Sequence, residues 1–156
     1  MPMLDEAFCE FLTGANAMMV ATRDTANAPT ITRPAGCVVS PDRTRVVVYL
    51  VEDPADPTIT NIRDTGAIAL VLARPSNYET YQLKGIDARS EAITDADQPN
   101  LLHYNDIIIA EMISVGLTRQ LASDIIPAPQ VSMARVSFSP CEVYRQTPGP
   151  GAGEKR

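Results

Sequence analysis

The segment Gly36-Cys37-Val38-Val39-Ser40-Pro41-Asp42-Arg43-Thr44-Arg45-Val46-Val47-Val48-Tyr49-Leu50-Val51 contains two runs rich in β-branched residues. β-branched side chains favour strands, because they pack well on a pleated surface. The separating residues Ser40, Pro41 and Asp42 belong to the types that set turn dihedrals or bond back to the backbone. The segment therefore predicts a β-hairpin.

Similar runs lie on both sides of this hairpin. They cover residues 17–22, 30–33, 67–73, 78–92 and 131–146, the last interrupted at Ser139-Pro140. Together they give six or seven strands of the antiparallel type. This count predicts a mainly β fold with inserted helices, in which the strands form a closed or nearly closed barrel, since closure removes exposed edges.

Three segments carry helix signals. Residues 4–14 have apolar side chains at helical spacing, and residues 56–63 have Pro57 near the start and Gly66 beyond the end. Thr94 and Asp97 have the spacing of a capping box, which opens a helical region running to about residue 126. Gly116 is expected to break or bend that region.

The sequence divides into one folded domain, residues 1–146, and a short tail, residues 147–156. A chain of 156 residues can bury a proper core in one domain. The tail is rich in Pro and Gly, which do not build a packed element. We therefore expect the tail to be mobile unless it closes over a ligand.

Composition excludes several classes of partner. The net charge of −6 opposes nucleic-acid binding, which depends on basic side chains. No apolar run is long enough to cross a bilayer, and residues 1–6 do not resemble a secretion signal. The three cysteines are scattered without metal-site spacing, so free buried or half-buried thiols are expected. These features predict a cytoplasmic protein without membrane or nucleic-acid partners.

Candidate binding residues lie on predicted strands. Thr80, Gln82 and Lys84 alternate along one strand and so share one face. They could present three donors to an anionic or carbonyl-rich ligand, or form an ordinary solvated strand face. Arg33 at a strand end is open to the same two interpretations. The single histidine, His103, lacks the neighbours of a known catalytic arrangement, so a surface or packing role is expected.

No nucleophile elbow, Walker A motif or dinucleotide-binding glycine motif occurs in the sequence. No metal site is expected either. If the protein is an enzyme, its reactive groups are therefore expected to come from an organic cofactor.

An ordered series of short motifs resembles the pyridoxamine 5′-phosphate oxidase-like FMN-binding family over roughly residues 8–90. The series is Ala28-Pro29-Thr30-Ile31-Thr32-Arg33-Pro34-Ala35-Gly36, residues 46–50, Asn61-Ile62-Arg63, Gly66-Ala67-Ile68-Ala69-Leu70-Val71 and Tyr81-Gln82-Leu83-Lys84-Gly85. The resemblance implies a six-stranded antiparallel Greek-key split barrel. It also implies a homodimer with FMN in grooves shared between the subunits.

The resemblance assigns roles to individual residues. It implies that Arg33 reaches the FMN phosphate and that Thr80, Gln82 and Lys84 follow the phosphate, ribityl chain and ring edge. It places Thr58 and Asn61 at helix-borne phosphate or ribityl contacts. Two departures are visible: Thr58 stands where the oxidases carry lysine, and the C-terminal substrate motif with its Trp is missing.

Three functions follow as hypotheses. The first is an FMN-dependent oxidoreductase acting on an unidentified small-molecule substrate or electron acceptor. The second is a dimer that holds flavin or another small anion without turnover. The third is a structural dimer with an empty groove. The missing substrate motif argues against assigning the oxidase reaction itself.

Overall fold

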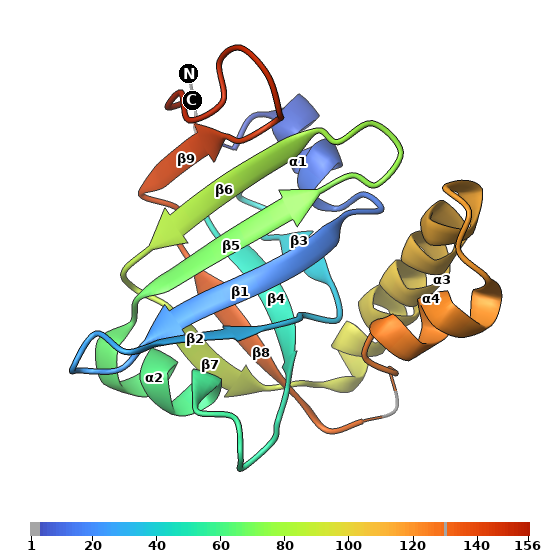
Figure 1. Ribbon diagram of the computed structural model, residues 1–156. Coiled ribbons are helices and arrows are strands. Elements are labelled where there is room, and N and C mark those ends of the chain that lie inside the picture. The colour runs from blue at the N-terminus through green and yellow to red at the C-terminus, as the bar shows by residue number, and fades with distance from the viewer. Residues whose placement is uncertain (1–3, 130) are drawn as a thin grey trace.

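The computed structural model describes residues 4–129 and 131–156, and its front layer is a five-stranded antiparallel sheet (Figure 1). The strand order is β2-β1-β5-β6-β9. The strands are β1 (Ala17–Arg23), β2 (Pro29–Thr32), β5 (Ile68–Ala73), β6 (Thr80–Gly85) and β9 (Glu142–Arg145). Buried and less buried residues alternate along β1 and β5, so one side of this sheet faces the core.

A four-stranded antiparallel sheet lies behind the first, with the order β3-β4-β8-β7. Its strands are β3 (Cys37–Val39), β4 (Val46–Val51), β7 (Arg89–Ala92) and β8 (Met133–Phe138). β4 is buried along almost its whole length, which its continuous apolar run requires. The main core lies between the sheets, where residues such as Val20, Leu70, Leu83 and Val136 are fully buried.

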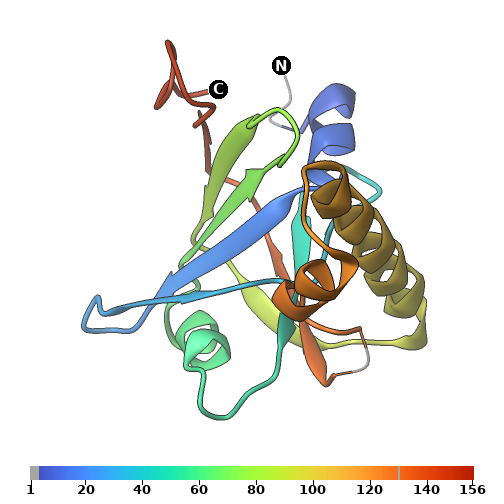
Figure 2. The ribbon, with the colours of Figure 1, turned by 45° about the vertical axis from the view of Figure 1, so that its right-hand side comes forward.

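Four helices surround the sheets without covering the front of the first one (Figures 1 and 2). They are α1 (Glu6–Leu12), α2 (Thr58–Thr65), α3 (Gln98–Ser114) and α4 (Arg119–Ile125), with a short 3₁₀ turn at Asp95–Asp97. α2 packs against β1, β2 and β7, whereas α1 and α3 pack against β3. One face of the five-stranded sheet therefore remains without a helical cover.

Local sequence signals explain the helix ends. The Asp5 side chain accepts a hydrogen bond from the Phe8 N–H and caps α1. α2 ends at Gly66, whose φ of 67° is the left-handed conformation that glycine adopts without steric cost. Thr94 and Asp97 form the predicted capping box. Gly116 separates α3 from α4, as expected.

The prediction of one long strand over residues 78–92 is wrong. β6 ends at Gly85 and β7 begins at Arg89 in the other sheet, so the chain crosses between sheets at residues 86–88. A Cβ at Gly85 would lie 2.5 Å from the Phe138 ring, so the chain passes close to the core at this point. Contacts between elements distant in sequence, rather than local propensity, fix this corner.

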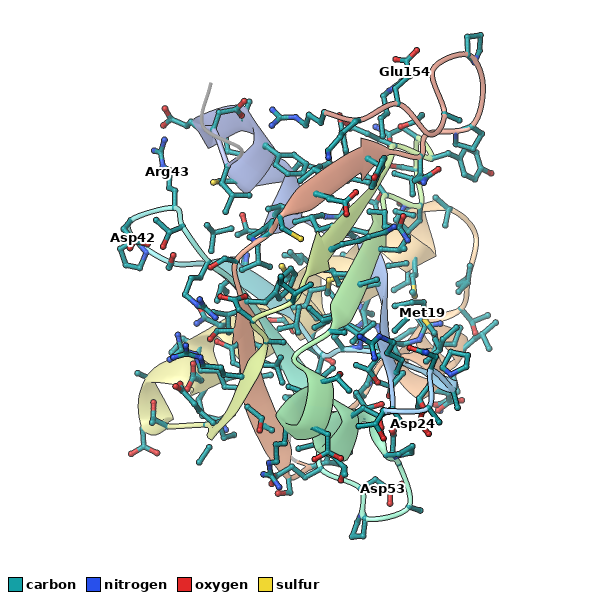
Figure 3. All side chains as sticks on the ribbon, turned by 90° about the vertical axis from the view of Figure 1, so that its left-hand side faces the viewer. Met19, Asp24, Asp42, Arg43, Asp53 and Glu154 are labelled. Atoms are coloured by element: carbon teal, nitrogen blue, oxygen red, sulfur yellow. The ribbon has the colours of Figure 1, made fainter. Side chains whose placement is uncertain are left out.

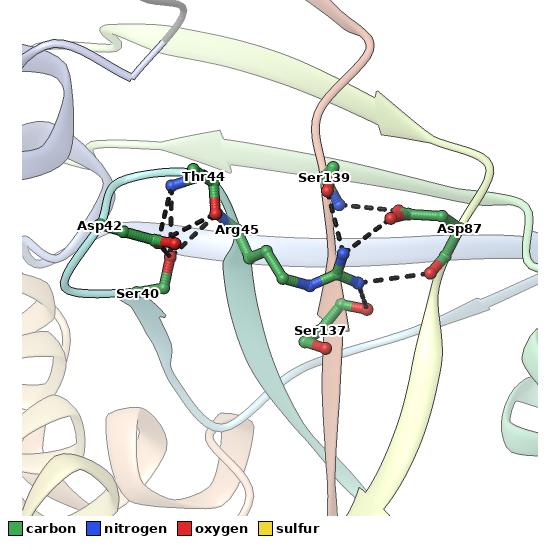
Figure 4. Close-up of polar contacts among 7 residues, drawn as sticks. All are labelled: Ser40, Asp42, Thr44, Arg45, Asp87, Ser137 and Ser139. Carbon is green, nitrogen blue, oxygen red and sulfur yellow. Dashed lines mark hydrogen bonds and ion pairs between the residues drawn. The ribbon is translucent and has the colours of Figure 1, made fainter.

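Arg45 links this corner to the crossing from β8 to β9 (Figure 4). Its guanidinium donates to the Asp87 carboxylate at 2.7 Å, to the Ser139 hydroxyl at 2.9 Å and to the Ser137 carbonyl at 3.0 Å. The Ser139 N–H donates to Asp87 Oδ1 at 2.7 Å. Arg45 therefore joins the β6–β7 crossing to the β8–β9 crossing, the two places in this region where the chain passes from one sheet to the other.

The described residues form nine strands in two sheets, so the six-stranded closed barrel is not confirmed. The interruption predicted at Ser139-Pro140 does divide residues 131–146 into β8 and β9. Residues 78–92 are likewise divided, into β6 and β7. Two segments that we predicted as one strand each therefore form four strands. The coarser prediction of antiparallel sheets with inserted helices is confirmed, although helices and strands contribute nearly equally, so the fold is mixed rather than mainly β.

The Pro/Gly-rich tail folds back along β9 instead of extending from the domain. The Arg145 N–H donates to the Glu154 carbonyl at 2.9 Å, and the Gly153 N–H donates to the Arg145 carbonyl at 2.7 Å. Gly153 has a φ of 89°, which glycine tolerates in a tight turn. Backbone pairing with β9 therefore supplies the order that we did not expect from composition.

Several sequence expectations concern features outside the sheets. No helix among the described residues is long and apolar enough to span a membrane. All three cysteines are free; Cys37 is buried and Cys9 half-buried, but Cys141 is exposed, contrary to expectation. Residues 1–3 and Gln130 lie outside the described residues. Residues 1–3 belong to the segment 1–6, in which we expect no secretion signal.

Candidate functional site

The side of the five-stranded sheet that faces away from the core is called the outer face here. Its residues alternate with the buried ones: Ala17, Met19 and Ala21 on β1, Ile31 on β2, Ala69, Val71 and Ala73 on β5, Thr80, Gln82 and Lys84 on β6, and Glu142 and Tyr144 on β9. Its centre consists of alanines with Met19 and Val71. Figure 3 shows Met19 pointing away from the core on this side.

A groove with a volume of about 420 Å³ occupies one end of the outer face. Ala21 and Ala69 lie opposite each other on β1 and β5 and leave space above the sheet because their side chains are small. The groove is bordered by Thr22, Arg23, Ala67, Ile68, Lys84, Gly85, Ile86, Cys141 and Glu142. Its floor is thus flat and apolar, while its rim carries polar and charged groups.

Lys84 is one of two cations that border the groove, the other being Arg23. Lys84 lies between Ala69 on β5 and Glu142 on β9 in the strand register. Its Nζ is 5.1 Å from the centre of the Tyr144 ring, within the range of a cation–π contact. Within residues 4–129 and 131–156, Lys84 makes no ion pair. Its ammonium is therefore available to an anion.

Glu142 is engaged away from Lys84. The Tyr144 hydroxyl donates a hydrogen bond to its Oε2, and the Lys155 Nζ lies 3.8 Å from the same oxygen. The hydrogen bond from Tyr144 is the main reason that the pKa of Glu142 is lowered, and the charges of Lys155 and, less strongly, Lys84 add to it. The same hydrogen bond raises the pKa of Tyr144. Glu142 is therefore an anion at neutral pH.

The structure places Thr80, Gln82 and Lys84 together on the outer face of β6, as their spacing predicted. The intervening side chains, Tyr81 and Leu83, pack against the core. The Thr80 hydroxyl donates to the Tyr78 carbonyl at 2.8 Å. These three predicted residues thus form one polar stripe beside the apolar centre.

Thr58 and Asn61 lie elsewhere, on the buried side of α2. The Asn61 amide donates to the hydroxyl of Thr22 at 3.2 Å and to that of Thr30 at 3.5 Å. The Thr58 hydroxyl is buried and has no hydrogen-bond partner among the described residues. These contacts join α2 to β1 and β2. Thr22 also borders the groove, but its side chain is on the core side of β1, so Asn61 contacts this strand from the side opposite the outer face.

Arg33 lies beyond the end of β2, two residues after Ile31. Lys84 is in line with Ile31 across β5 and β1, and adjacent strands are about 4.8 Å apart, so Arg33 lies at least roughly 14 Å from Lys84. The described residues give Arg33 no hydrogen bond or ion pair. Arg33 lies near Tyr104. Burial raises the pKa of Tyr104, and the positive charge of Arg33 offsets only part of that rise. Within one protomer, the backbones of Arg33 and Lys84 are thus separated by β1 and β5.

Among the residues that border the groove, sequence reasoning identified Lys84 alone, and it missed Cys141, Glu142 and the adjoining Tyr144 and Lys155. The alternation of Glu142 and Tyr144 in the strand after Ser139-Pro140 could have indicated that both share a face. Lys155 gave no signal, because its position depends on the return of the tail. His103 is exposed on α3, which packs against β3 of the four-stranded sheet and does not border the groove. No group of three or more His, Cys, Asp or Glu residues in the described parts of the chain could hold a metal ion.

Comparison with known proteins establishes the fold. No protein-family model matches the chain, and no curated protein sequence matches it. Among solved structures, HupZ of Group A Streptococcus is 17% identical with a TM-score of 0.56, and the match covers 96% of this chain and 99% of HupZ.

Two further structures carry names that describe ligands. A pyridoxamine 5′-phosphate oxidase-related FMN-binding protein from Nostoc punctiforme is 13% identical with a TM-score of 0.50, over 88% of this chain and 77% of that one. HutZ, the heme storage protein of Vibrio cholerae, is 11% identical with a TM-score of 0.52, over 91% and 94%. The chain therefore has the fold of the pyridoxamine 5′-phosphate oxidase-like proteins, which the ordered motifs of its sequence predicted.

Proposed function

We propose that this protein binds FMN on the outer face and acts as a flavin-dependent oxidoreductase. The observation that carries the proposal is the groove of about 420 Å³ with an alanine floor and a rim holding the unpaired Lys84. A volume of this size is typical of small-molecule sites. The FMN-binding protein of the same fold supports the choice of ligand.

The residues of the outer face suit the parts of FMN. A planar, largely apolar ring needs a flat surface without large side chains, which Ala21 and Ala69 provide. The phosphate is close to a dianion and needs cationic donors, for which Lys84 and Arg33 are proposed. Thr80 and Gln82 offer a hydroxyl and an amide to the ribityl chain or the ring edge.

Buried Thr58 and Asn61 take supporting parts in the proposal. Asn61 donates to the Thr22 hydroxyl on the core side of β1 and so supports the strand whose other side carries Ala21 in the groove. The Thr58 hydroxyl is buried and unpaired in the described part of the protein, so it can donate to a buried water molecule. Both would act through the end of β1.

The proposed site is shared between two copies in a homodimer. Within a protomer, β1 and β5 lie between Arg33, which follows β2, and Lys84 on β6. In a symmetric dimer formed by the outer faces, Lys84 of one copy and the partner subunit's Arg33 can approach the same ligand. The exposed apolar residues Met19 and Ile31 would then be buried between the copies.

The proposed chemistry belongs mainly to the cofactor. Flavin accepts and donates hydride or electrons, and the protein binds it, orients it and excludes water. The donor would be a reduced nicotinamide or another small reductant, and the acceptor a small molecule. Cys141, a free and exposed thiol, suits a reducing compartment, so a cytoplasmic location is part of the proposal.

A dimer that binds flavin without turnover is the alternative function. The missing substrate motif supports it, because no substrate-binding residues are identified besides the cofactor contacts. Heme binding, known for HutZ, is less well supported: the single histidine is on α3, which packs on the four-stranded sheet. Turnover with reduced nicotinamide separates the enzyme from the binding protein.

The test is titration of the purified protein with FMN and with riboflavin, preceded by an absorption spectrum of the protein as purified. Lys84→Gln is expected to weaken FMN binding roughly ten- to hundredfold while changing riboflavin binding little, since only FMN carries the phosphate. Arg119→Gln, a matched change at an exposed arginine on α4, should leave both affinities unchanged. Absence of FMN binding by the unaltered protein contradicts the proposal, as does equal binding by Lys84→Gln.

A further inference from the structure

The returning tail adds a row of side chains beside β9. Besides the two bonds of Arg145, the Arg156 N–H donates to the Val143 carbonyl at 2.8 Å. A single antiparallel β-bridge pairs Lys155 with Tyr144 of β9. Because paired residues point to the same side of a sheet, Lys155 lies on the outer face next to Tyr144. Figure 3 shows the neighbouring Glu154 beyond β9 at the end of the molecule.

Lys155 and Tyr144 both act on the carboxylate of Glu142. The Lys155 Nζ is 3.8 Å from Glu142 Oε2, and the Tyr144 hydroxyl donates to the same oxygen. Glu142 has Lys84 as its register neighbour on β6. Opposite charges facing each other on adjacent strands attract, so a Glu142–Lys84 ion pair is the arrangement expected without the tail.

In the described structure, Glu142 forms its ion pair with Lys155 and not with Lys84. Lys84 rests over the Tyr144 ring at 5.1 Å without an ion pair. An ammonium paired with a carboxylate has part of its charge compensated and one of its three donors occupied, so it attracts a phosphate less strongly. The choice of partner made by Glu142 therefore determines how readily Lys84 binds an anion.

We propose that Lys155 is a positioning residue for the groove: it holds Glu142 and so leaves the Lys84 ammonium free for the anionic group of the ligand. The inference rests on the proposed function for the identity of that ligand, and it deepens the function by giving the tail a part in the site. Lys155 touches no ligand in this scheme and acts through Glu142 alone.

The first test compares FMN and riboflavin affinities in the full-length protein. Lys155→Met is expected to weaken FMN binding about two- to fivefold, the size of an exposed ion pair, with riboflavin binding unchanged. Lys155→Arg should retain the affinity of the unaltered protein. The double variant Lys155→Met/Glu142→Gln should recover it, because the competing carboxylate is gone. An unchanged FMN affinity in Lys155→Met, or a loss that Glu142→Gln does not reverse, overturns the inference.

The second test needs no ligand and separates this inference from the proposed function. Crystal structures of the unaltered protein and of Lys155→Met are compared. Lys155→Met is expected to bring the Glu142 carboxylate within ion-pair distance of the Lys84 Nζ, because the two residues are register neighbours on adjacent strands. If the unaltered protein binds no FMN, the proposed function fails while this comparison still decides the role of Lys155. A Glu142 carboxylate that stays away from Lys84 in Lys155→Met overturns the inference.

Discussion

Arg33 is the single residue on which the proposed phosphate site can be tested most cleanly. Its guanidinium makes no hydrogen bond or ion pair in the described part of the chain, and it follows the last residue of β2. Arg33→Ala is therefore expected to leave the melting temperature nearly unchanged. FMN affinity should fall roughly ten- to hundredfold, the effect of losing a charged hydrogen-bond partner, with riboflavin affinity largely retained.

The measurement is a pair of titrations beside thermal melts of the unaltered and altered proteins. Arg119→Ala, at an exposed position of α4, is the matched control and should match the unaltered protein in both. Equal FMN affinity in folded Arg33→Ala would remove Arg33 from the site. A large fall in melting temperature would instead give Arg33 a structural role.

The elements that the sequence predicts well are those with local signals. The hairpin of β3 and β4 follows from β-branched runs around Ser40-Pro41-Asp42, and α2 follows from Pro57 and Gly66. Thr80, Gln82 and Lys84 share a face because the period of a strand is two. Residues 78–92 look like one strand because nothing local marks their crossing, which depends on Arg45 and Phe138 far away in sequence.

The same reasoning explains which parts of the site could be predicted. The polar stripe on β6 is visible in the spacing of its residues, whereas the Tyr144–Glu142–Lys155 arrangement depends on where β9 and the tail lie. The composition of the tail indicates flexibility, but backbone pairing with β9 overrides it. Tertiary contacts of this kind leave no periodic trace in a sequence.

At the corners between the sheets, Asp87 is expected to make stability depend on pH. Burial raises the pKa of Asp87, but the bonds from the Ser139 N–H and the Arg45 guanidinium outweigh it and hold the pKa below its ordinary value of 3.8. A carboxyl with a lowered folded-state pKa stabilises the protein above its unfolded-state pKa. That stabilisation is lost as the pH falls through the folded-state pKa.

Asp87→Asn should therefore lower the free energy of unfolding at pH 7 by about 1–2 kcal/mol, allowing for the partial exposure of the pair. The difference between the two proteins should shrink as the pH falls below about 4. Urea melts between pH 3 and 7 measure it. Asp106→Asn, on an exposed position of α3, is the control and should lie on the curve of the unaltered protein. A difference that stays constant down to pH 3 would show that the Asp87 charge is not what stabilises the corner.

At the scale of the whole molecule, α1 and the C-terminal tail lie side by side at one edge of the five-stranded sheet (Figures 1 and 2). The Arg156 guanidinium lies 2.5 Å from the Asp5 carboxylate and 4.4 Å above the Phe8 ring. The tail thus covers the β9 edge, which would otherwise present unpaired backbone groups. The helices occupy the remaining sides, so the outer face is the broad sheet surface left open to a second copy.

A charge placed at the centre of the outer face tests the proposed dimer. Met19 is 37% exposed and lies between Val71 and the β2 edge, where a symmetric contact would bury it twice. Met19→Lys would place two unpaired ammonium groups in an apolar interface, which costs several kcal/mol, so dimer affinity should fall more than about a hundredfold. Sedimentation equilibrium at micromolar concentration should show a dimer for the unaltered protein and a monomer for this variant.

The same variant should also lose FMN, because each proposed site needs residues of both copies. Leu121→Lys makes the same change at an apolar residue that is 50% exposed on α4, outside the outer face, and should leave both dimer and FMN affinity intact. A Met19→Lys protein that remains dimeric would place the contact elsewhere. A folded monomer that still binds FMN with full affinity would show that one protomer forms the site alone, since the contribution of the partner would then be zero.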